Sequence, residues 1–286
     1  MPALLALLSA MLWGVGDFVG GLASRRSTPL QTLVVTTPAG LLLVVPFAIV
    51  IGGEVTGSVV PGLVAGLFGS FGILLLYAAL SVGPMGVVSP VSAVLGAAIP
   101  VVVGLARGER PGAAAYLGMA LAVVAIVTVG LEPEAPTDDA VHQRVTPRAL
   151  LLAIGAGLGI GAFFSIVALA PKDAGVYPVV FARSMSTVVL MGLGLVVALR
   201  RRTTYLPHST SVRWQSVLAG GLDAGANAVY VVAAHTGLLS VVAVLGSLYP
   251  ATTVVLARFV LAERLRPMQV VGMVTAIVAA VLLALG

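Results

Sequence analysis

Few ionisable side chains lie inside the long apolar runs of this 286-residue sequence, and those few are the candidates for chemistry. Asp17 lies in the run 3–23, about four residues from its middle and so roughly 6 Å from the centre of a spanning helix. An isolated carboxylate there costs on the order of 2.5–3.5 kcal/mol, so it must face a wet cavity, meet a partner or be protonated. Three interpretations stay open: a site for a proton or a cationic amine, a structural ion pair, and a helix that ends early near Gly20 and Gly21.

A polar stripe follows one face of the run 215–236. Asp223, Asn227 and Tyr230 stand at positions i, i+4 and i+7, which lie on the same side of a helix. Such a stripe on an otherwise apolar helix is typical of a cavity wall. The alternative is hydrogen bonding between helices that only holds the bundle together, at about 0.6 kcal/mol per contact.

Arg183 lies about seven residues into the run 176–199, and we expect it to form a structural ion pair with Asp17 or Asp223. The alternative is that its long stem reaches the lipid headgroups. Trp13 and Tyr77 are candidate aromatic walls, although aromatic residues in membrane helices commonly pack or mark the interface. The predicted substrate-binding set is therefore Trp13, Asp17, Tyr77, Asp223, Asn227 and Tyr230, with Asp17 as the proton-coupling group.

Several kinds of site are excluded or unsupported. The chain has no cysteine and no Walker lysine motif. Its histidines and carboxylates are not spaced as the ligands of a metal site usually are. We therefore expect no catalytic residue, metal or cofactor. The alternating glycines of residues 155–161 lie within an apolar run that predicts a helix. There they favour close packing of helices over a dinucleotide site. Glu109-Arg110 and Glu263-Arg264 stand at loop mouths, where salt bridges or helix caps are expected. The arginines lack the aromatic interleaving of a nucleic-acid surface.

The composition requires a membrane protein. Apolar residues make up 59% of the chain and charged residues 9%, too few charges to cover a soluble globule of this size. Cutting at clusters of charge, proline and glycine predicts an all-α integral membrane protein with ten spanning helices. The predicted spans are 3–23, 30–52, 61–82, 87–106, 112–131, 149–170, 176–199, 215–236, 241–260 and 268–286.

The two halves of the chain resemble each other. A shift of 154 residues places Gly83 on Gly237, Glu109-Arg110 on Glu263-Arg264 and Gly118-Met119 on Gly272-Met273 without a gap. This pattern predicts a first repeat at 1–131, a polar linker at 132–148 and a second repeat at 149–286. Because each half has five helices, the repeats must be inverted in the membrane, which is the basis of alternating access to a midplane site.

The residues resemble the drug/metabolite transporter superfamily, in its ten-helix EamA-like branch. The resemblance is carried by Leu248-Tyr249-Pro250, the stretch from Ala262 to Leu265 with Gln269 and Gly272, Leu12-Trp13-Gly14, and residues 77–84. The resemblance covers nearly the whole chain. It implies a bundle of ten helices around a central cavity and export of small metabolites, such as amino acids, or of drug-like solutes. Two departures stand out: Gly96 where relatives carry proline, and Asp17 where many carry asparagine.

The expected function is that of a secondary carrier, an exporter coupled to protons, in the plasma membrane of a bacterium, as a monomer or homodimer surrounded by lipid. Two alternatives stay open: an intramembrane enzyme acting on a lipid-linked substrate, and a scaffold that transports nothing. The orientation is also open. The resemblance implies cytoplasmic termini, whereas most arginines lie in the loops that would then face outward, against the positive-inside rule.

Overall fold

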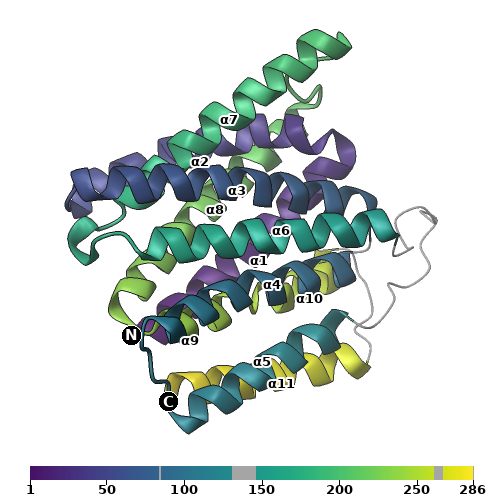
Figure 1. The fold of residues 1–286 in the computed structure, drawn as a ribbon. Coiled ribbons are helices and arrows are strands. Elements are labelled where there is room, and N and C mark those ends of the chain that lie inside the picture. The colour runs from purple at the N-terminus through teal and green to yellow at the C-terminus, as the bar shows by residue number, and fades with distance from the viewer. Residues whose placement is uncertain (84, 131–145, 261–266, 286) are drawn as a thin grey trace.

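The chain forms a bundle of long helices in the computed structural model, which describes residues 1–83, 85–130, 146–260 and 267–285 (Figure 1). The ten predicted spans are all occupied by helix, with the ninth divided in two. The elements are α1 (Pro2–Arg26), α2 (Pro29–Ile51), α3 (Thr56–Val82), α4 (Met85–Ala106), α5 (Ala113–Gly130), α6 (Pro147–Ala168), the 3-10 turn η2 (Lys172–Ala174), α7 (Tyr177–Arg201), α8 (Thr210–Thr236), α9 (Leu239–Gly246), α10 (Tyr249–Val260) and α11 (Pro267–Leu285).

Length and hydropathy agree with spanning helices. Among the described residues, seven helices are long and apolar enough to cross a bilayer, and shorter apolar helical segments cover 113–128, 239–253 and 270–283. Residues 132–145 of the predicted linker and the pair Glu263-Arg264 lie outside the described residues. The two ends of the chain lie on the same side of the bundle, as an even number of crossings requires (Figure 1).

The helix ends follow local sequence signals. Thr28 accepts a hydrogen bond from the amide of Gln31, whose side chain accepts one from the amide of Thr28, so a capping box starts α2. Thr146 caps α6 in the same position, and both helices carry proline in the first turn, where its missing N–H costs nothing. These signals place the helix starts near the predicted boundaries.

The internal repeat appears in the helix boundaries and in the packing. Helices α3 and α8 begin and end exactly 154 residues apart, at Thr56–Val82 and Thr210–Thr236. Helix α3 packs along α6, and α8 packs along α1, the counterpart of α6 in the first half. Likewise α3 contacts α7 while α8 contacts α2, and α5 pairs with its own counterpart α11. The two halves therefore pack across each other through equivalent surfaces.

Two glycines related by the repeat make these crossings close. A Cβ added to Gly66 in α3 would collide with the backbone of Ala182 in α7. A Cβ added to Gly220 in α8, 154 residues later, would collide with the backbone of Thr36 in α2. Because lipid is as apolar as the helix surfaces, association here depends on such close van der Waals contact.

The ninth span differs from its prediction as one helix over 241–260. Helix α9 ends at Gly246 and α10 begins at Tyr249, because Pro250 has no N–H to continue the ladder. The amide of Leu248 instead turns back to the carbonyl of Leu245, at 3.2 Å. The repeat places Gly96 opposite Pro250, and α4 runs unbroken through that position. The break is thus a feature of the second half among the described residues.

Glu109 caps α9 from the other half of the chain. Its carboxylate accepts hydrogen bonds from the amides of Leu239 at 2.7 Å and Ser240 at 3.0 Å, and from the Ser240 hydroxyl at 2.6 Å. An anion at a helix N-terminus meets free N–H groups and the positive end of the dipole. The helix-cap interpretation of Glu109 is confirmed.

We expect Gly220→Ala to lower the stability of the bundle, because its methyl group has no room against the backbone of Thr36. The cost of overpacking is about 1–3 kcal/mol. Gly225→Ala, on the same helix with open space around it, is the matched control and should be neutral or stabilising by up to about 1 kcal/mol. Thermal unfolding of the purified protein in detergent measures both, and equal midpoints for the two variants would contradict this packing.

Candidate functional site

A cavity of about 540 Å³, including the part that opens outward, lies between the two halves of the bundle. Both halves of the chain contribute walls. The first half contributes α1 and α3, and the second half contributes α6, α7, α8 and α10. The lining residues are Trp13, Asp17, Gly69, Ile73, Leu76, Ile160, Phe163, Phe164, Arg183, Ser186, Asp223, Asn227 and Tyr249. Apolar and aromatic walls with a few polar groups are typical of a small-molecule site.

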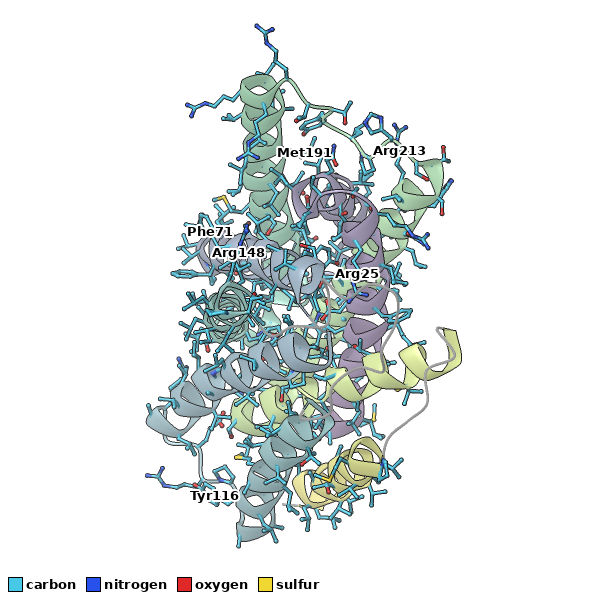
Figure 2. All side chains as sticks on the ribbon, turned by 90° about the vertical axis from the view of Figure 1, so that its right-hand side faces the viewer. Arg25, Phe71, Tyr116, Arg148, Met191 and Arg213 are labelled. Atoms are coloured by element: carbon cyan, nitrogen blue, oxygen red, sulfur yellow. The ribbon has the colours of Figure 1, made fainter. Side chains whose placement is uncertain are left out.

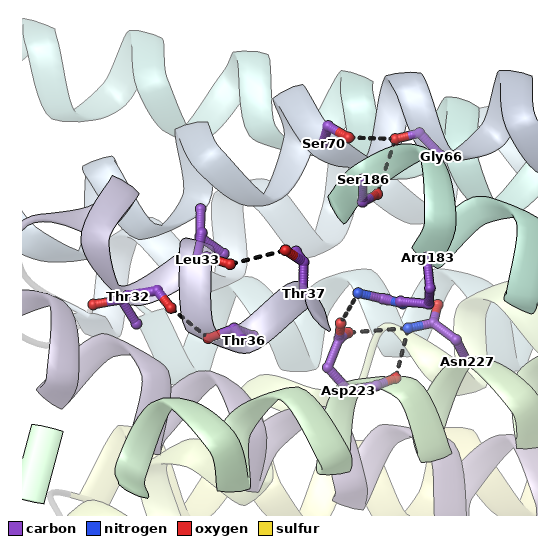
Figure 3. Close-up of polar contacts among 10 residues, drawn as sticks. All are labelled: Thr32, Leu33, Thr36, Thr37, Gly66, Ser70, Arg183, Ser186, Asp223 and Asn227. Carbon is purple, nitrogen blue, oxygen red and sulfur yellow. Dashed lines mark hydrogen bonds and ion pairs between the residues drawn. The ribbon is translucent and has the colours of Figure 1, made fainter. Parts of the chain in front are cut away.

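The cavity holds an ion pair between α7 and α8. Arg183 Nη1 lies 2.5 Å from Asp223 Oδ2, and only 7% of the arginine is exposed (Figure 3). Asn227 donates from Nδ2 to Asp223 Oδ1 at 3.0 Å and to the Asp223 carbonyl at 2.6 Å. The carboxylate of Asp223 is thus held by a cation and by an amide one turn along the same helix, as the stripe at i and i+4 predicts. Asp17 and Asp223 are the two predicted partners of Arg183, and the ion pair forms with Asp223.

Asp17 faces the same cavity from α1 and is half-buried. Within the described part of the chain, no hydrogen bond or ion pair engages its carboxylate. It lies near enough to Asp223 for the two carboxylates to repel each other. The cavity therefore contains one neutralised carboxylate and one without a described partner.

Aromatic rings close one side of the cavity. The ring centroids of Trp13 and Phe164 lie 4.8 Å apart, and Tyr230 packs behind them at 5.5 Å and 4.7 Å. Phe163 adds a second ring from α6, with its centroid 5.6 Å from that of Phe164. These rings present apolar faces that can also attract a cation.

The predicted residues divide into two groups. Trp13, Asp17, Asp223 and Asn227 line the cavity, whereas Tyr77 and Tyr230 do not. Tyr230 is seven residues past Asp223, about 10 Å further along the helix axis. Its ring is fully buried behind Trp13.

Tyr77 also lies behind the wall of the cavity. Its hydroxyl end fills the space over Gly20, and its ring belongs to an apolar cluster with Leu33, Leu80 and Leu190. Whatever Tyr77 contributes to binding must act through the position of α1 and α3, because its side chain is not exposed to the cavity.

Other lining residues escaped the sequence analysis. Ser186 lies one turn after Arg183 and donates to the carbonyl of Gly66 at 3.1 Å (Figure 3). Tyr249 contributes its ring just after the break between α9 and α10, with its hydroxyl 3.2 Å from Ser92 Oγ. The spacing of Ser186 from Arg183 could have indicated it. Tyr249 depends on the break, which the apolar pattern does not reveal.

The described residues contain no group of three or more histidine, aspartate or glutamate side chains placed to hold a metal ion. The polar groups that are present, two carboxylates, a guanidinium, an amide and hydroxyls, can bind a small charged solute through hydrogen bonds and ion pairs.

We expect Arg183→Met and Asp223→Leu to each lower stability by about 3–5 kcal/mol, because each leaves the partner charge buried alone. The double variant should lose far less than the sum, since no charge remains uncompensated. Thermal unfolding of the four proteins gives the coupling. Asp173→Asn, at an exposed carboxylate in η2, is the control and should change nothing. Additive losses in the double variant would show that the pair is not energetically coupled.

Comparison with known proteins agrees with this architecture. A model of the EamA-like transporter family matches residues 1–131 and 147–285. A crystal structure titled only as that of a protein superimposes with a TM-score of 0.74 at 16% identity, covering 99% of this chain and 96% of the other, which supports the fold alone. No curated protein sequence matches significantly. With two family matches covering nearly all of its length, the chain belongs to the EamA-like transporter family, a multi-pass membrane protein for secondary transport of small solutes and not an enzyme.

Proposed function

We propose that this protein exports amino acids with apolar side chains, or closely related amines, across the bacterial plasma membrane in exchange for protons. One observation carries the proposal. Asp17 and Arg183 face the same cavity, and each retains a charged or polar group without a described partner. A zwitterion offers the two complementary groups in one small molecule.

Asp17 is the proposed site for the ammonium group. Its carboxylate has no cation among the described residues, whereas Asp223 is already paired with Arg183. A bound ammonium would remove the cost of an isolated charge near the membrane centre. The adjacent face of Trp13 adds attraction for the same cation.

Arg183 is the proposed site for the carboxylate group. One edge of its guanidinium binds Asp223, while its Nε is buried without a hydrogen-bond partner in the described structure. A buried donor left unpaired costs about 1–3 kcal/mol, so a ligand oxygen there is favourable. An arginine can serve two carboxylates at once because its five N–H donors point in different directions.

The rest of the cavity suits an apolar side chain. Ile73, Leu76, Ile160 and Phe163 contribute walls without a hydrogen-bonding side chain, and these walls would leave a polar cargo side chain unpaired. Small or strongly polar amino acids should therefore bind less well. This selectivity would come from the desolvation of the cargo.

The packing of the bundle supports alternating access. The cavity lies between halves that contact each other through equivalent surfaces, α3 on α6 and α8 on α1. Inverted repeats of this kind give two related packings, each open to one side of the membrane. Tyr249, next to the break between α9 and α10, links one of the irregular segments directly to the cavity wall.

Proton exchange follows from the same carboxylate. Asp17 can hold either a proton or the cargo ammonium, and occupancy by one excludes the other. Protonation from one side then releases the cargo there, and deprotonation on the other side restores the binding site. Competition for one group is sufficient for antiport.

Asp17→Asn should abolish transport driven by a pH gradient while exchange of cargo across proteoliposomes continues, because asparagine is neutral at every pH. The half-saturation concentration for exchange should rise about tenfold with the loss of a charged hydrogen bond. Counterflow of labelled cargo with and without a pH gradient measures both. Asp173→Asn should retain both activities. An unchanged pH dependence in Asp17→Asn would reject Asp17 as the coupling group.

Cargo analogues test the two-point site. Phenylalanine should compete in counterflow better than phenethylamine, which lacks the carboxylate, and better than 3-phenylpropionate, which lacks the amine. In Arg183→Lys the ion pair to Asp223 can persist but the Nε donor is lost, so the preference of phenylalanine over phenethylamine should fall about tenfold. Equal competition by all three compounds in the unaltered protein would contradict recognition by Asp17 and Arg183.

A further inference from the structure

A second, larger cavity lies at the end of the bundle where most arginines gather. It measures about 1620 Å³, including the part that opens outward, and shares no lining residue with the central cavity. Its walls come from the start of α2, the end of α3, the start of α6, the end of α7 and residues 203–208. Figure 2 looks onto this end of the bundle, with Arg25, Arg148 and Arg213 labelled.

This second cavity, called the cleft below, has apolar walls and a positively charged mouth. Its walls include Leu30, Val34, Leu74, Leu152 and Val197, which are all apolar. Three arginines, Arg148, Arg201 and Arg202, line it where α6 starts and α7 ends. Among the described lining residues there is no aspartate or glutamate. The cleft is therefore amphipathic, with an excess of positive charge at the level where the helices leave the membrane.

The mouth of the cleft is built by specific bonds. Gln31 donates from Nε2 to the carbonyl of Thr204 at 2.8 Å and to its hydroxyl at 3.0 Å, so the start of α2 holds the segment after α7. The Thr204 hydroxyl also lies 3.1 Å from His208 Nε2. Arg202 ends α7 with a positive φ of 51°, which turns the chain sharply at this point. These bonds hold the backbone segment that follows Arg202 against the start of α2.

The end of α7 is anchored from its other side as well. The Tyr205 hydroxyl donates to the carbonyl of Met191 at 3.2 Å, and the amide of Thr203 donates to the carbonyl of Ala198 at 3.1 Å. Because the backbone at the mouth is held in place, little backbone entropy is lost when the cleft binds an anion.

The chemistry of the cleft matches one class of ligand. Guanidinium groups bind phosphate oxygens in a bidentate fashion, and basic pockets between membrane helices bind acidic lipid headgroups. Apolar walls below the arginines match acyl chains that continue into the hydrocarbon. A free inorganic anion would gain nothing from those walls, and an apolar neutral molecule would gain nothing from three guanidinium groups.

We infer that this cleft binds an anionic phospholipid, with Arg148, Arg201 and Arg202 at its phosphate and an acyl chain along Leu30, Val34 and Val197. The inference does not depend on the cargo of the central cavity, because the two cavities have no residue in common. Occupied, the lipid bridges α2, α3, α6 and α7, which belong to both halves of the bundle.

Native mass spectrometry of the purified protein tests this with dioleoyl phosphatidylglycerol and dioleoyl phosphatidylcholine as probes. The phosphatidylglycerol should bind at least about tenfold more tightly. Arg148→Gln, Arg201→Gln and Arg202→Gln should each weaken its binding about fivefold, which corresponds to the attraction of one arginine for an acidic headgroup. Arg200→Gln, at the neighbouring arginine outside the cleft, should leave binding unchanged.

A second pair of variants tests the acyl groove without altering charge. Val197→Trp fills the groove and should weaken binding of phosphatidylglycerol, whereas Val196→Trp, at an exposed neighbour outside the cleft, should not. Circular dichroism and the thermal midpoint in detergent confirm that each variant is folded.

Five results would overturn the inference. The first two are equal binding of phosphatidylglycerol and phosphatidylcholine, and equal weakening of phosphatidylglycerol binding by Arg200→Gln. The third is complete displacement of the lipid by inorganic phosphate, which would indicate a site for a free anion. The fourth is lipid binding only after the acidic residues Glu132, Glu134, Asp138 and Asp139 are replaced, which would assign the cleft to the chain's own linker. A dimer that dissociates in Arg201→Gln without any change in lipid binding would assign it to a second copy.

Discussion

The cost of a charge in hydrocarbon governs the centre of this molecule. Arg183 and Asp223 enter the bilayer on different helices and neutralise each other at 2.5 Å. Removal of either would leave the other without compensation in a medium that solvates ions poorly. The pair therefore ties α7 to α8 and sets the position of the cavity wall. It also leaves Asp17 without a described partner, and in the proposed function this is the carboxylate that a proton or a cargo neutralises.

Close contact between backbones provides the second condition for this arrangement. In lipid there is no hydrophobic force to press apolar helices together, so small residues decide which surfaces meet. Gly66 and Gly220 bring α3 onto α7 and α8 onto α2 at positions related by the repeat. Each contact crosses from one half of the chain to the other. Because these crossings are equivalent, exchange between two packings of the halves requires no new kind of interface, which is the property a carrier needs.

The two halves of the chain differ in the ninth span and in the placement of their polar groups. Pro250 breaks the ninth span, while Gly96 lets α4 continue. The residue that follows the break, Tyr249, contributes to the cavity wall. At the opposite end, arginines from the start of α6 and the end of α7 surround an amphipathic cleft. The bundle is thus nearly symmetric in its scaffold and asymmetric in its polar groups.

Much of this molecule follows from the sequence alone. The ten spans, the 154-residue repeat and the polar stripe of Asp223 and Asn227 depend on local composition and helical periodicity, which residues carry wherever they are placed. Other features depend on the rotation and crossing of separate helices. These features are the pairing of Arg183 with Asp223, the position of Tyr77 and Tyr230 outside the cavity lining, and the presence of Ser186 and Tyr249 in it. Lipid-facing and cavity-facing sides of a membrane helix are both apolar, so hydropathy cannot fix that rotation. The packing of glycine against backbone and the Arg183–Asp223 pair decide it, and with it which side chains share the cavity.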